Sequence, residues 1–196
     1  MSHDQRRIEV ADAAWKVIVR EGLDRTSIRA IAYELGSSTA MVTHYFRNKD
    51  ELTIFTLDLA FERALENMQA STQGLQGIER LERMIVSALP LEANSVMEWQ
   101  VWVAFLGYAV GRKNLIQEHQ KRYQRLQQII CQELADLQAE NLIRDDLDLA
   151  TEANAIIALV DGIGTGSVIK PDQIQAEQQR YIVRRHIKML MTASST

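Results

Sequence analysis

Small polar side chains between residues 26 and 49 could bind a nucleic acid. The hydroxyls of Thr26, Ser27 and Ser38 and the ammonium of Lys49 are groups that contact phosphate oxygens. The side chains that follow Ser38 carry hydroxyl, methyl and imidazole groups, which can match the edges of bases in the major groove. These candidate base contacts are Thr39, Ala40, Met41, Thr43 and His44, and the adjacent Tyr45 completes the candidate DNA-binding set.

Three short helical segments are expected to hold these groups. The first runs over Gln5–Glu21, with apolar residues at helical spacing. The second begins after Thr26, a good N-cap, and ends at Gly36, while Ser38 caps a third that stops near Arg47. A major groove roughly 12 Å wide admits one helix, which a neighbour must present through a tight turn. The layout therefore predicts a helix-turn-helix unit.

The rest of the chain predicts more helices, because only 2 prolines and 9 glycines interrupt the 196 residues. A long helix is expected over Lys49–Ala70, followed by a joint at Gln73–Gly77. Five further helices are expected over Ile78–Leu89, Ser95–Gly111, Asn114–Glu140, Asp148–Val168 and Asp172–Met191. The predicted fold class is all-α, with an N-terminal three-helix domain over residues 1–52 and a larger helical domain over residues 53–196.

Composition and charge are typical of a cytoplasmic protein with a buried core, since 46% of the residues are hydrophobic. The longest unbroken apolar run, Val101–Gly111, has 11 residues, against roughly 20 needed to span a bilayer. We expect no signal peptide, no internal disulfide and no cofactor, and Cys131 reads as a small buried filler. The net charge is −4, with basic and acidic residues balanced over residues 1–52. DNA affinity must then come from a local face.

Residues 13–52 resemble the N-terminal domain of the TetR family of bacterial repressors. The matching positions are Ala13-Ala14, Gly22, Thr26–Ala32, Gly36–Phe46 and Lys49–Leu52. Ser37, Ala40 and Thr43 depart from the family pattern, which has valine, glycine and tyrosine there. The resemblance implies a homodimeric repressor that binds a pseudo-palindromic DNA operator and is released by a small-molecule effector. In that case residues 53–196 bind the effector and form the dimer.

Four aromatic residues lie at three-residue steps from Trp99 to Tyr108, and on spacing alone such a stripe is more often part of a core than of a ligand site. The segment Trp99–Leu134 resembles the BetI branch of TetR-like regulators, which respond to choline and related quaternary ammonium compounds. This resemblance implies an aromatic site for a choline-like cation. The candidate effector pocket comprises Met84, Trp99, Trp102, Phe105, Tyr108 and Tyr123.

The glycines of Asp161–Gly166 suggest a nucleotide loop only superficially, because no strand precedes them. Small residues on a helix instead permit close helix approach. In the TetR family the last two helices pair with their copies in a second subunit. The resemblance therefore assigns Leu149–Val168 and Ile174–Met191 to dimerisation.

Other classes of function are weakly represented in the sequence. Glu118, His119 and His186 lack the spacing of metal ligands, and no catalytic constellation is present, so we expect no enzyme and no metal site. The alternative to a regulator is a ligand-binding or protein-interaction module with a non-functional DNA head. For a regulator, displacement of the Lys49–Ala70 helix is the expected route by which an effector changes the separation of two reading helices.

Overall fold

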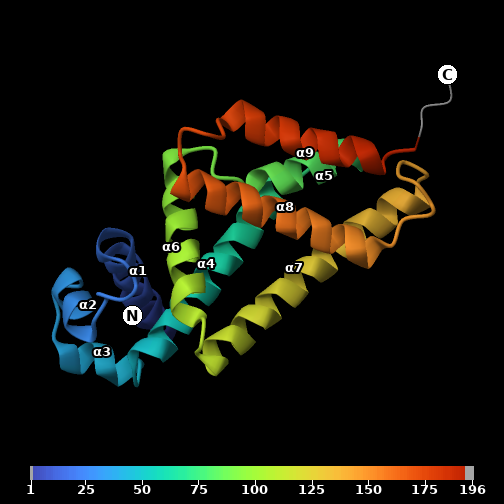
Figure 1. Ribbon diagram of the computed structural model, residues 1–196. Coiled ribbons are helices and arrows are strands. Elements are labelled where there is room, and N and C mark those ends of the chain that lie inside the picture. Colours follow the sequence, from blue (N-terminus) through green and yellow to red (C-terminus); the bar gives the residue numbers. More distant parts are fainter. Residues whose placement is uncertain (1, 193–196) are drawn as a thin grey trace. The chain divides into compact units, whose positions relative to one another are not determined.

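The computed structural model describes residues 2–192, and this part of the chain folds into nine α-helices (Figure 1). They are α1 His3–Glu21, α2 Ile28–Glu34, α3 Thr39–Tyr45, α4 Lys49–Ser71, α5 Gly77–Ser87, α6 Ala93–Ala109, α7 Lys113–Ala139, α8 Leu149–Ile169 and α9 Ala176–Leu190. Within residues 2–192, β-type pairing is confined to one isolated antiparallel bridge between Ile143 and Met191. The all-α prediction is confirmed, and each expected helix forms close to its expected bounds.

The chain forms two compact units. The first contains residues 1–64 and 100–119, and the second contains residues 65–99 and 120–196. Helices α4, α6 and α7 each contribute residues to both units. The first unit therefore holds the three helices expected in residues 1–52 together with parts of three later helices. The final four residues of the chain lie outside the described residues.

Short polar side chains set the helix starts around the candidate site. Ser2 and Gln5 form a capping box, in which each side chain accepts a hydrogen bond from the other's backbone N–H, so α1 begins earlier than expected. Ser27, not Thr26, caps α2 by accepting from a backbone N–H within the helix. Ser38 caps α3 in the same way, as expected.

The turn between α2 and α3 requires a glycine at position 36. Gly36 has φ +63°, in the left-handed region that glycine adopts without strain. Its N–H donates to the carbonyl of Tyr33 at 3.0 Å, and the N–H of Ser37 donates to the carbonyl of Ala32 at 2.9 Å. These two bonds form a Schellman turn that satisfies the last carbonyls of α2. The turn places α3 directly after α2.

A dedicated core lies under α1, α2, α3 and the start of α4. Its buried members are Val10, Ala13, Ala14, Val17, Ile31, Ala32, Val42, Phe46 and Leu52. Phe46 is fully buried, and its ring centroid lies 5.3 Å from that of Phe55. The guanidinium of Arg7 covers both rings, at 4.8 Å and 4.4 Å from their centroids. The inner face of α3 is therefore fixed by packing.

The second unit has its own core between α5, α7, α8 and α9, with Leu81, Leu134, Ile156 and Ile187 almost completely buried. Arg80 and Glu133 form a salt bridge of 2.8 Å at its edge. Cys131 packs partly buried against this core, which suits a small filler.

The last helix begins at Ala176 rather than at the expected Asp172. The reason is a capping box that the sequence pattern did not reveal, in which the backbone N–H of Gln175 donates to the side chain of Gln178 at 3.1 Å. The residues before it form turns.

Helix α8 is unusually apolar. Among residues 2–192 it is the one helix long and apolar enough, by length and composition alone, to cross a membrane. Counting unbroken apolar runs overlooked it, because small and polar residues such as Asn154, Gly162 and Thr165 interrupt the sequence. Only 33% of its most apolar window is buried within the chain. Much of its surface is thus left for a further contact.

Candidate DNA-binding site

Helix α3 presents an exposed polar ridge. The side chains of Thr39, Ala40, Thr43 and His44 are exposed, whereas Val42 between them is fully buried. Met41 and Tyr45 are partly buried and pack against the core beneath α3. One face of this short helix therefore holds it in place, and the opposite face is free to meet a partner. We call Thr39, Ala40, Thr43 and His44 the reading ridge.

Hydrogen bonding decides which groups the ridge offers. The hydroxyl of Thr43 donates within the helix, to the carbonyl of Thr39 at 3.1 Å and that of Ala40 at 3.2 Å. Thr43 therefore offers chiefly its methyl group, next to the methyl of Ala40. The imidazole of His44 meets the ring of Tyr45 edge-on, with centroids 4.9 Å apart. The ridge combines apolar methyl contacts with polar ends.

Two of the predicted DNA contacts are engaged inside the protein. Thr26 is only 4% exposed, and its hydroxyl donates to the carbonyl of Gly22 at 2.9 Å. The ammonium of Lys49 donates to the carbonyls of Leu23 at 2.5 Å and Asp24 at 3.4 Å. Burial lowers the pKa of Lys49. Both groups bind the loop between α1 and α2 in this fold. Their contact with phosphates stays a prediction.

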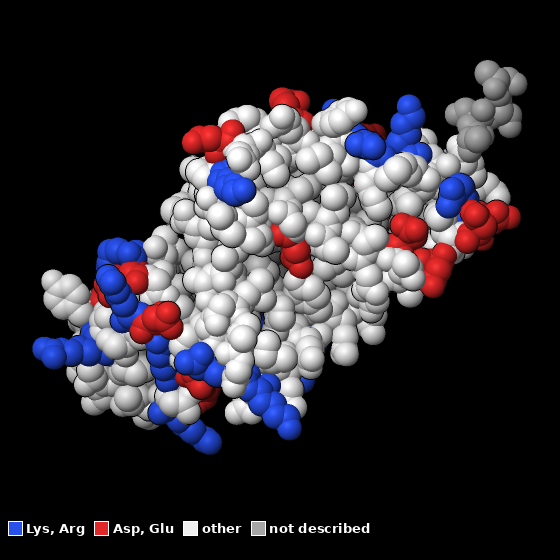
Figure 2. Space-filling model, in the orientation of Figure 1, with Lys and Arg blue, Asp and Glu red and all other residues white. Residues whose placement is uncertain are grey.

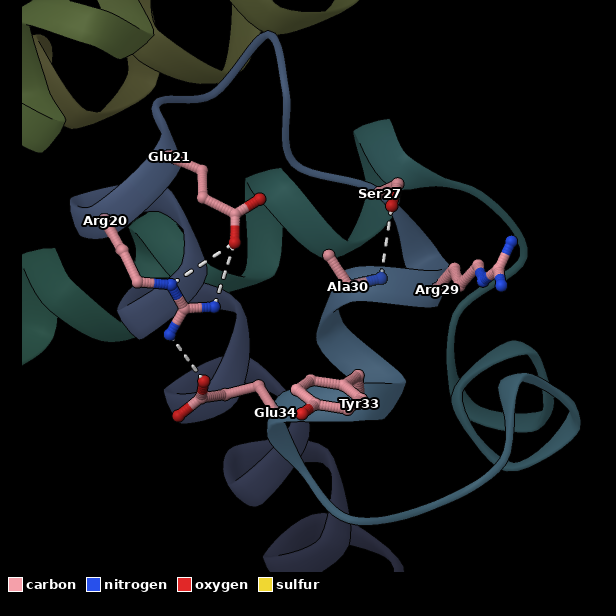
Figure 3. Close-up of a pocket in the computed structure, with 7 residues that line it drawn as sticks. All are labelled: Arg20, Glu21, Ser27, Arg29, Ala30, Tyr33 and Glu34. Carbon is pink, nitrogen blue, oxygen red and sulfur yellow. Dashed lines mark hydrogen bonds and ion pairs between the residues drawn. The ribbon is translucent and has the colours of Figure 1, made fainter.

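A surface hollow of about 530 Å³ lies beside α2 and is lined in part by Arg20, Arg29, Tyr33 and Glu34 (Figure 3). Arg20 is neutralised there, because its guanidinium donates to Glu34 at 2.7 Å and also to Glu21. The hydrogen bond from Arg20 lowers the pKa of the Glu34 carboxyl. Arg29 points away from this group and forms no ion pair within residues 2–192.

Tyr33 is the most exposed large side chain recorded beside the reading ridge, at 86%. It follows Arg29 by one helical turn, so both extend from the same side of α2. Sequence reasoning missed both residues, because the pairing of an arginine and the exposure of a tyrosine depend on the fold. Figure 2 shows several Lys and Arg side chains projecting from the part of the molecule formed by α1, α2 and α3.

Trp99, a predicted pocket residue, packs against the backbone of α8. A Cβ added to Gly164 would lie 2.3 Å from carbons of the indole ring. The indole N–H donates to the carbonyl of Ala88 at 2.9 Å, which fixes the ring in this position. Gly164 thus permits a close helix approach, as predicted for the glycines of this segment.

Trp102 and Phe105 lie together in the first unit, with ring centroids 6.0 Å apart. The ring of His119 lies 5.0 Å from Trp102 and 5.8 Å from Phe105. Phe105 is 1% exposed and packs in a core cluster with Ile18 and Leu57, whereas Trp102 is only partly buried. Phe105 is therefore a core side chain, and Trp102 is the more accessible ring of the pair.

The remaining predicted pocket residues have separate partners. Tyr108 donates from its hydroxyl to a carboxylate oxygen of Asp50 at 3.0 Å, at the start of α4. Met84 is 5% exposed on α5. The hydroxyl of Tyr123 donates to the carboxylate of Asp161. Asp161 was not among the predicted pocket residues, because it lies in a glycine-rich segment that was assigned to helix packing.

Burial raises the pKa of the Asp161 carboxyl, against the opposing effect of the Tyr123 hydrogen bond. A raised pKa in the folded state means that the carboxyl supports folding when protonated and loses that contribution as pH rises through its pKa. We expect Asp161→Asn to raise the melting temperature at neutral pH, with the gain disappearing in acid. Thermal melts across this pH range measure it.

Asp148→Asn is the matched control, because hydrogen bonds from Thr151 lower the pKa of the exposed Asp148 carboxyl. Its contribution to stability is present at neutral pH and is lost as pH falls. The control should therefore show no gain at neutral pH. An equal gain in both variants would contradict the assignment of Asp161.

The histidines singled out in the sequence have other neighbours. His119 lies against two aromatic rings, and Nε2 of His186 lies 3.9 Å from a carboxylate oxygen of Glu152. Over residues 2–192, no group of three or more His, Cys, Asp or Glu side chains is placed to hold a metal ion.

A helix exposed along one polar face, fixed by a tight glycine turn on a three-helix core, defines a helix-turn-helix DNA-binding domain. Residues 10–54 match the family described as bacterial regulatory proteins, tetR family. Residues 77–192 match the BetI-type transcriptional repressor C-terminal domain. The chain belongs to the tetR family of transcriptional regulators, in the group with a BetI-type C-terminal domain.

Curated relatives extend over nearly the whole chain. The regulator PksA of Bacillus subtilis (strain 168) is 27% identical over 192 residues, which cover 97% of this chain and 92% of PksA. The regulator BetI of Vibrio campbellii (strain ATCC BAA-1116) is 26% identical over 199 residues, covering 95% of this chain and 92% of BetI. Both are named HTH-type transcriptional regulators, so the chain is a DNA-binding transcriptional regulator.

Solved structures share the fold. A transcriptional regulator from Rhodococcus sp. Rha1 superposes with a TM-score of 0.83 at 23% identity, covering 94% of this chain and 95% of its own. A regulator from Saccharomonospora viridis, solved in complex with choline, superposes with a TM-score of 0.87 at 23% identity. The match covers 97% of this chain and 100% of that regulator. At these identities the likeness establishes the fold alone.

Proposed function

We propose that this chain represses transcription as a homodimer that binds a pseudo-palindromic operator and leaves it when a small organic cation binds. The observation that carries the proposal is the reading ridge, four exposed side chains on a helix whose other face is locked into a core. In this proposal residues 1–52 read DNA, and residues 53–196 bind the effector and form the dimer.

The chemistry of the ridge suggests what it reads. Ala40 and Thr43 offer methyl groups, which suit contact with thymine methyls in the major groove. Thr39 and His44 can form hydrogen bonds with base edges or phosphates. The hydroxyl oxygens of Ser27 and Ser38 accept the hydrogen bonds that cap their helices. Their hydroxyl protons can still be donated to phosphates. Met41 and Tyr45 border the ridge, each partly committed to packing.

A gel-shift experiment tests the proposal. The full-length protein should retain the DNA upstream of its own gene against excess unrelated competitor, with affinity falling steeply as salt rises. Binding that does not distinguish this DNA from competitor would favour the alternative, a ligand-binding or protein-interaction module with a non-functional DNA head.

Arg29 and Tyr33 are proposed as contacts to the DNA backbone, because the first helix of a helix-turn-helix crosses the backbone. Arg29→Gln is expected to weaken binding to all sequences and to reduce the slope of log affinity against log salt by about 1. Salt titrations of operator binding measure this slope. Arg20→Gln is the matched control from the same hollow. Its guanidinium already pairs with Glu34, so its slope should stay that of the wild type.

The dimer is proposed to form through α8 and α9. The exposed residues of α8 carry no charge, and from Thr151 onward they recur at helical spacing; they are Ala150, Thr151, Asn154, Ala158, Gly162 and Ile169. On α9 the exposed Tyr181 and Met189 add apolar surface, at 65% and 57%. The uncharged face of α8 suits a two-fold contact between helices. Sedimentation of wild type and Ala158→Arg tests it, since a charge at the centre of that face should shift the protein to monomer.

The effector is proposed to be a cation of the choline class. Aromatic faces attract quaternary ammonium groups, and the ring of Tyr123 packs partly buried against the core of the second unit. Asp161 supplies a partly buried carboxylate beside Tyr123. Trp99, Phe105 and Tyr108 are committed to packing or to other partners, and Met84 is buried. We therefore base the proposal on Tyr123 and Asp161, which lie together in the second unit.

Choline should quench tryptophan fluorescence and release the operator, and Asp161→Asn should move both midpoints to roughly tenfold higher choline. No response at millimolar choline would remove this effector. We further propose that the effector favours a conformation in which α4 is displaced, which changes the spacing of the two reading helices. Equal head separation with and without effector, measured between spin labels, would count against that mechanism.

The family consists of regulators, and we infer no enzymatic activity and a bacterial cytoplasmic location, where the operator would be. In the proposed dimer, the second subunit would cover the uncharged face of α8.

A further inference from the structure

We infer that Tyr108 is a positioning residue that clamps the start of α4 and the loop before α2, with Lys49 as the internal partner of the clamp rather than a contact to DNA. This inference rests on the proposed function, because it concerns how the DNA-reading head is held. It adds Tyr108 of α6, and Arg112 just after that helix, to the residues that support DNA binding.

The clamp consists of Lys49, Asp50, Tyr108 and Arg112, all within the first compact unit. The hydroxyl of Tyr108 donates to Asp50 at 3.0 Å. The ammonium of Lys49 lies 4.9 Å from the centroid of the Tyr108 ring, and the guanidinium carbon of Arg112 lies 3.8 Å from it. Arg112 also donates to the backbone carbonyl of Tyr108. One aromatic ring thus interacts with two cations and one carboxylate.

The clamp reaches the DNA-reading head through Lys49. Its ammonium donates to two carbonyls of the loop between α1 and α2, those of Leu23 and Asp24. Within the same loop, the hydroxyl of the buried Thr26 donates to the carbonyl of Gly22. Because Ser27 at the end of this loop caps α2, a movement of Tyr108 would be passed to α2 and from there through the Gly36 turn to α3.

Two carbonyl acceptors and the Tyr108 ring hold the Lys49 ammonium in the clamp, although its electrostatic environment opposes the positive charge. Burial lowers its pKa, and the nearby charge of Arg112 acts in the same direction, while Asp24 and Asp50 act against them. Burial and the Asp50 hydrogen bond raise the pKa of Tyr108, so the phenol stays protonated and able to donate. An ammonium that already has two carbonyl acceptors and an aromatic face would lose these contacts by turning toward a phosphate.

Salt dependence of operator binding separates a positioning residue from a phosphate contact. Tyr108→Phe removes the hydroxyl and keeps the ring, and it should lower operator affinity roughly threefold or more. Tyr108→Leu and Lys49→Gln should lower it further. All three should keep the wild-type slope of log affinity against log salt, because no phosphate contact is lost. Arg29→Gln, which should reduce the slope, is the matched control.

A double variant tests whether Lys49 and Tyr108 act together. The losses in affinity should not add, so Lys49→Gln with Tyr108→Leu should bind about as well as the weaker single variant. A slope reduced by about 1 in Lys49→Gln, with unchanged affinity in Tyr108→Phe, would overturn the inference and restore Lys49 as a phosphate contact.

Hydrogen exchange tests the clamp without DNA. Tyr108→Phe should speed amide exchange in residues 22–27 and in the first turn of α4, with residues in the core of α1 unchanged. If the protein binds no specific DNA but exchange changes as expected, the clamp stands and the proposed function fails. If operator binding is intact and exchange is unchanged in Tyr108→Phe, the clamp is wrong while the proposed function stands.

Discussion

Phe46→Ala is expected to lower the free energy of unfolding of the DNA-binding head by about 3–5 kcal/mol. Phe46 is fully buried, and its ring packs against Phe55 and lies under Arg7. Truncation would leave a cavity directly behind the reading ridge, so operator binding should be lost together with stability. Urea unfolding followed by circular dichroism, with parallel gel shifts, measures both effects.

Tyr33→Ala is the control for that experiment. Its ring is 86% exposed, so its removal should change stability by no more than about 0.5 kcal/mol. A Phe46→Ala protein as stable as Tyr33→Ala would show that the core beneath α3 does not hold the head.

Gly164→Val is the second substitution with a large expected effect, a loss of about 1–3 kcal/mol or more in unfolding free energy. An added Cβ would lie 2.3–2.4 Å from three carbons of the Trp99 ring. The ring cannot turn aside without breaking the hydrogen bond between its N–H and Ala88. Thermal melting of the full chain measures the loss.

Gly107→Ala is the matched control, because no atom lies within 4 Å of the added Cβ in the interior of α6. It should raise the unfolding free energy by roughly 0.5–1 kcal/mol through helix propensity. Combining Gly164→Val with Trp99→Phe should recover part of the loss, since the smaller ring relieves the clash. Equal melting temperatures for the two glycine variants would mean that Trp99 does not rest on Gly164.

Local patterns were enough to predict the helices and the reading ridge. Helical spacing, the serine cap at Ser38 and the glycine at Gly36 act over a few residues, so they can be read from the sequence directly. The exposure of Thr39, Ala40, Thr43 and His44 followed from the same periodicity, because Val42 and Phe46 had to face the core. The start of α9 was missed because its glutamine capping box is an uncommon signal.

Tertiary contacts decided the rest, and they are not visible in spacing. Thr26 and Lys49 look like phosphate contacts in the sequence. In the fold the Thr26 hydroxyl donates to the carbonyl of Gly22, and the Lys49 ammonium donates to the carbonyl of Leu23. The aromatic residues of α6 share one helix yet have different neighbours. Trp99 rests on Gly164 and Tyr108 binds Asp50, while Phe105 is fully enclosed.

Charge pairing also depends on the fold. Arg20 and Arg29 are equivalent in a count of basic residues, but only Arg20 meets Glu34 in space. In the sequence Asp161 looked like part of a small-residue helix contact, whereas in the fold its carboxyl is partly buried and accepts a hydrogen bond from Tyr123. Both distinctions require the packing of helices far apart in the chain.

Selection of bound sequences from random DNA tests the role of the reading ridge most directly. The wild-type protein should enrich a two-fold symmetric motif. Thr39→Ala with His44→Ala should lose the base preferences in each half-site while keeping salt-dependent binding to DNA of any sequence. Gln117→Ala, an exposed change on α7, should enrich the wild-type motif. The same motif enriched by the ridge variant would contradict the assignment of α3 as the helix that reads DNA.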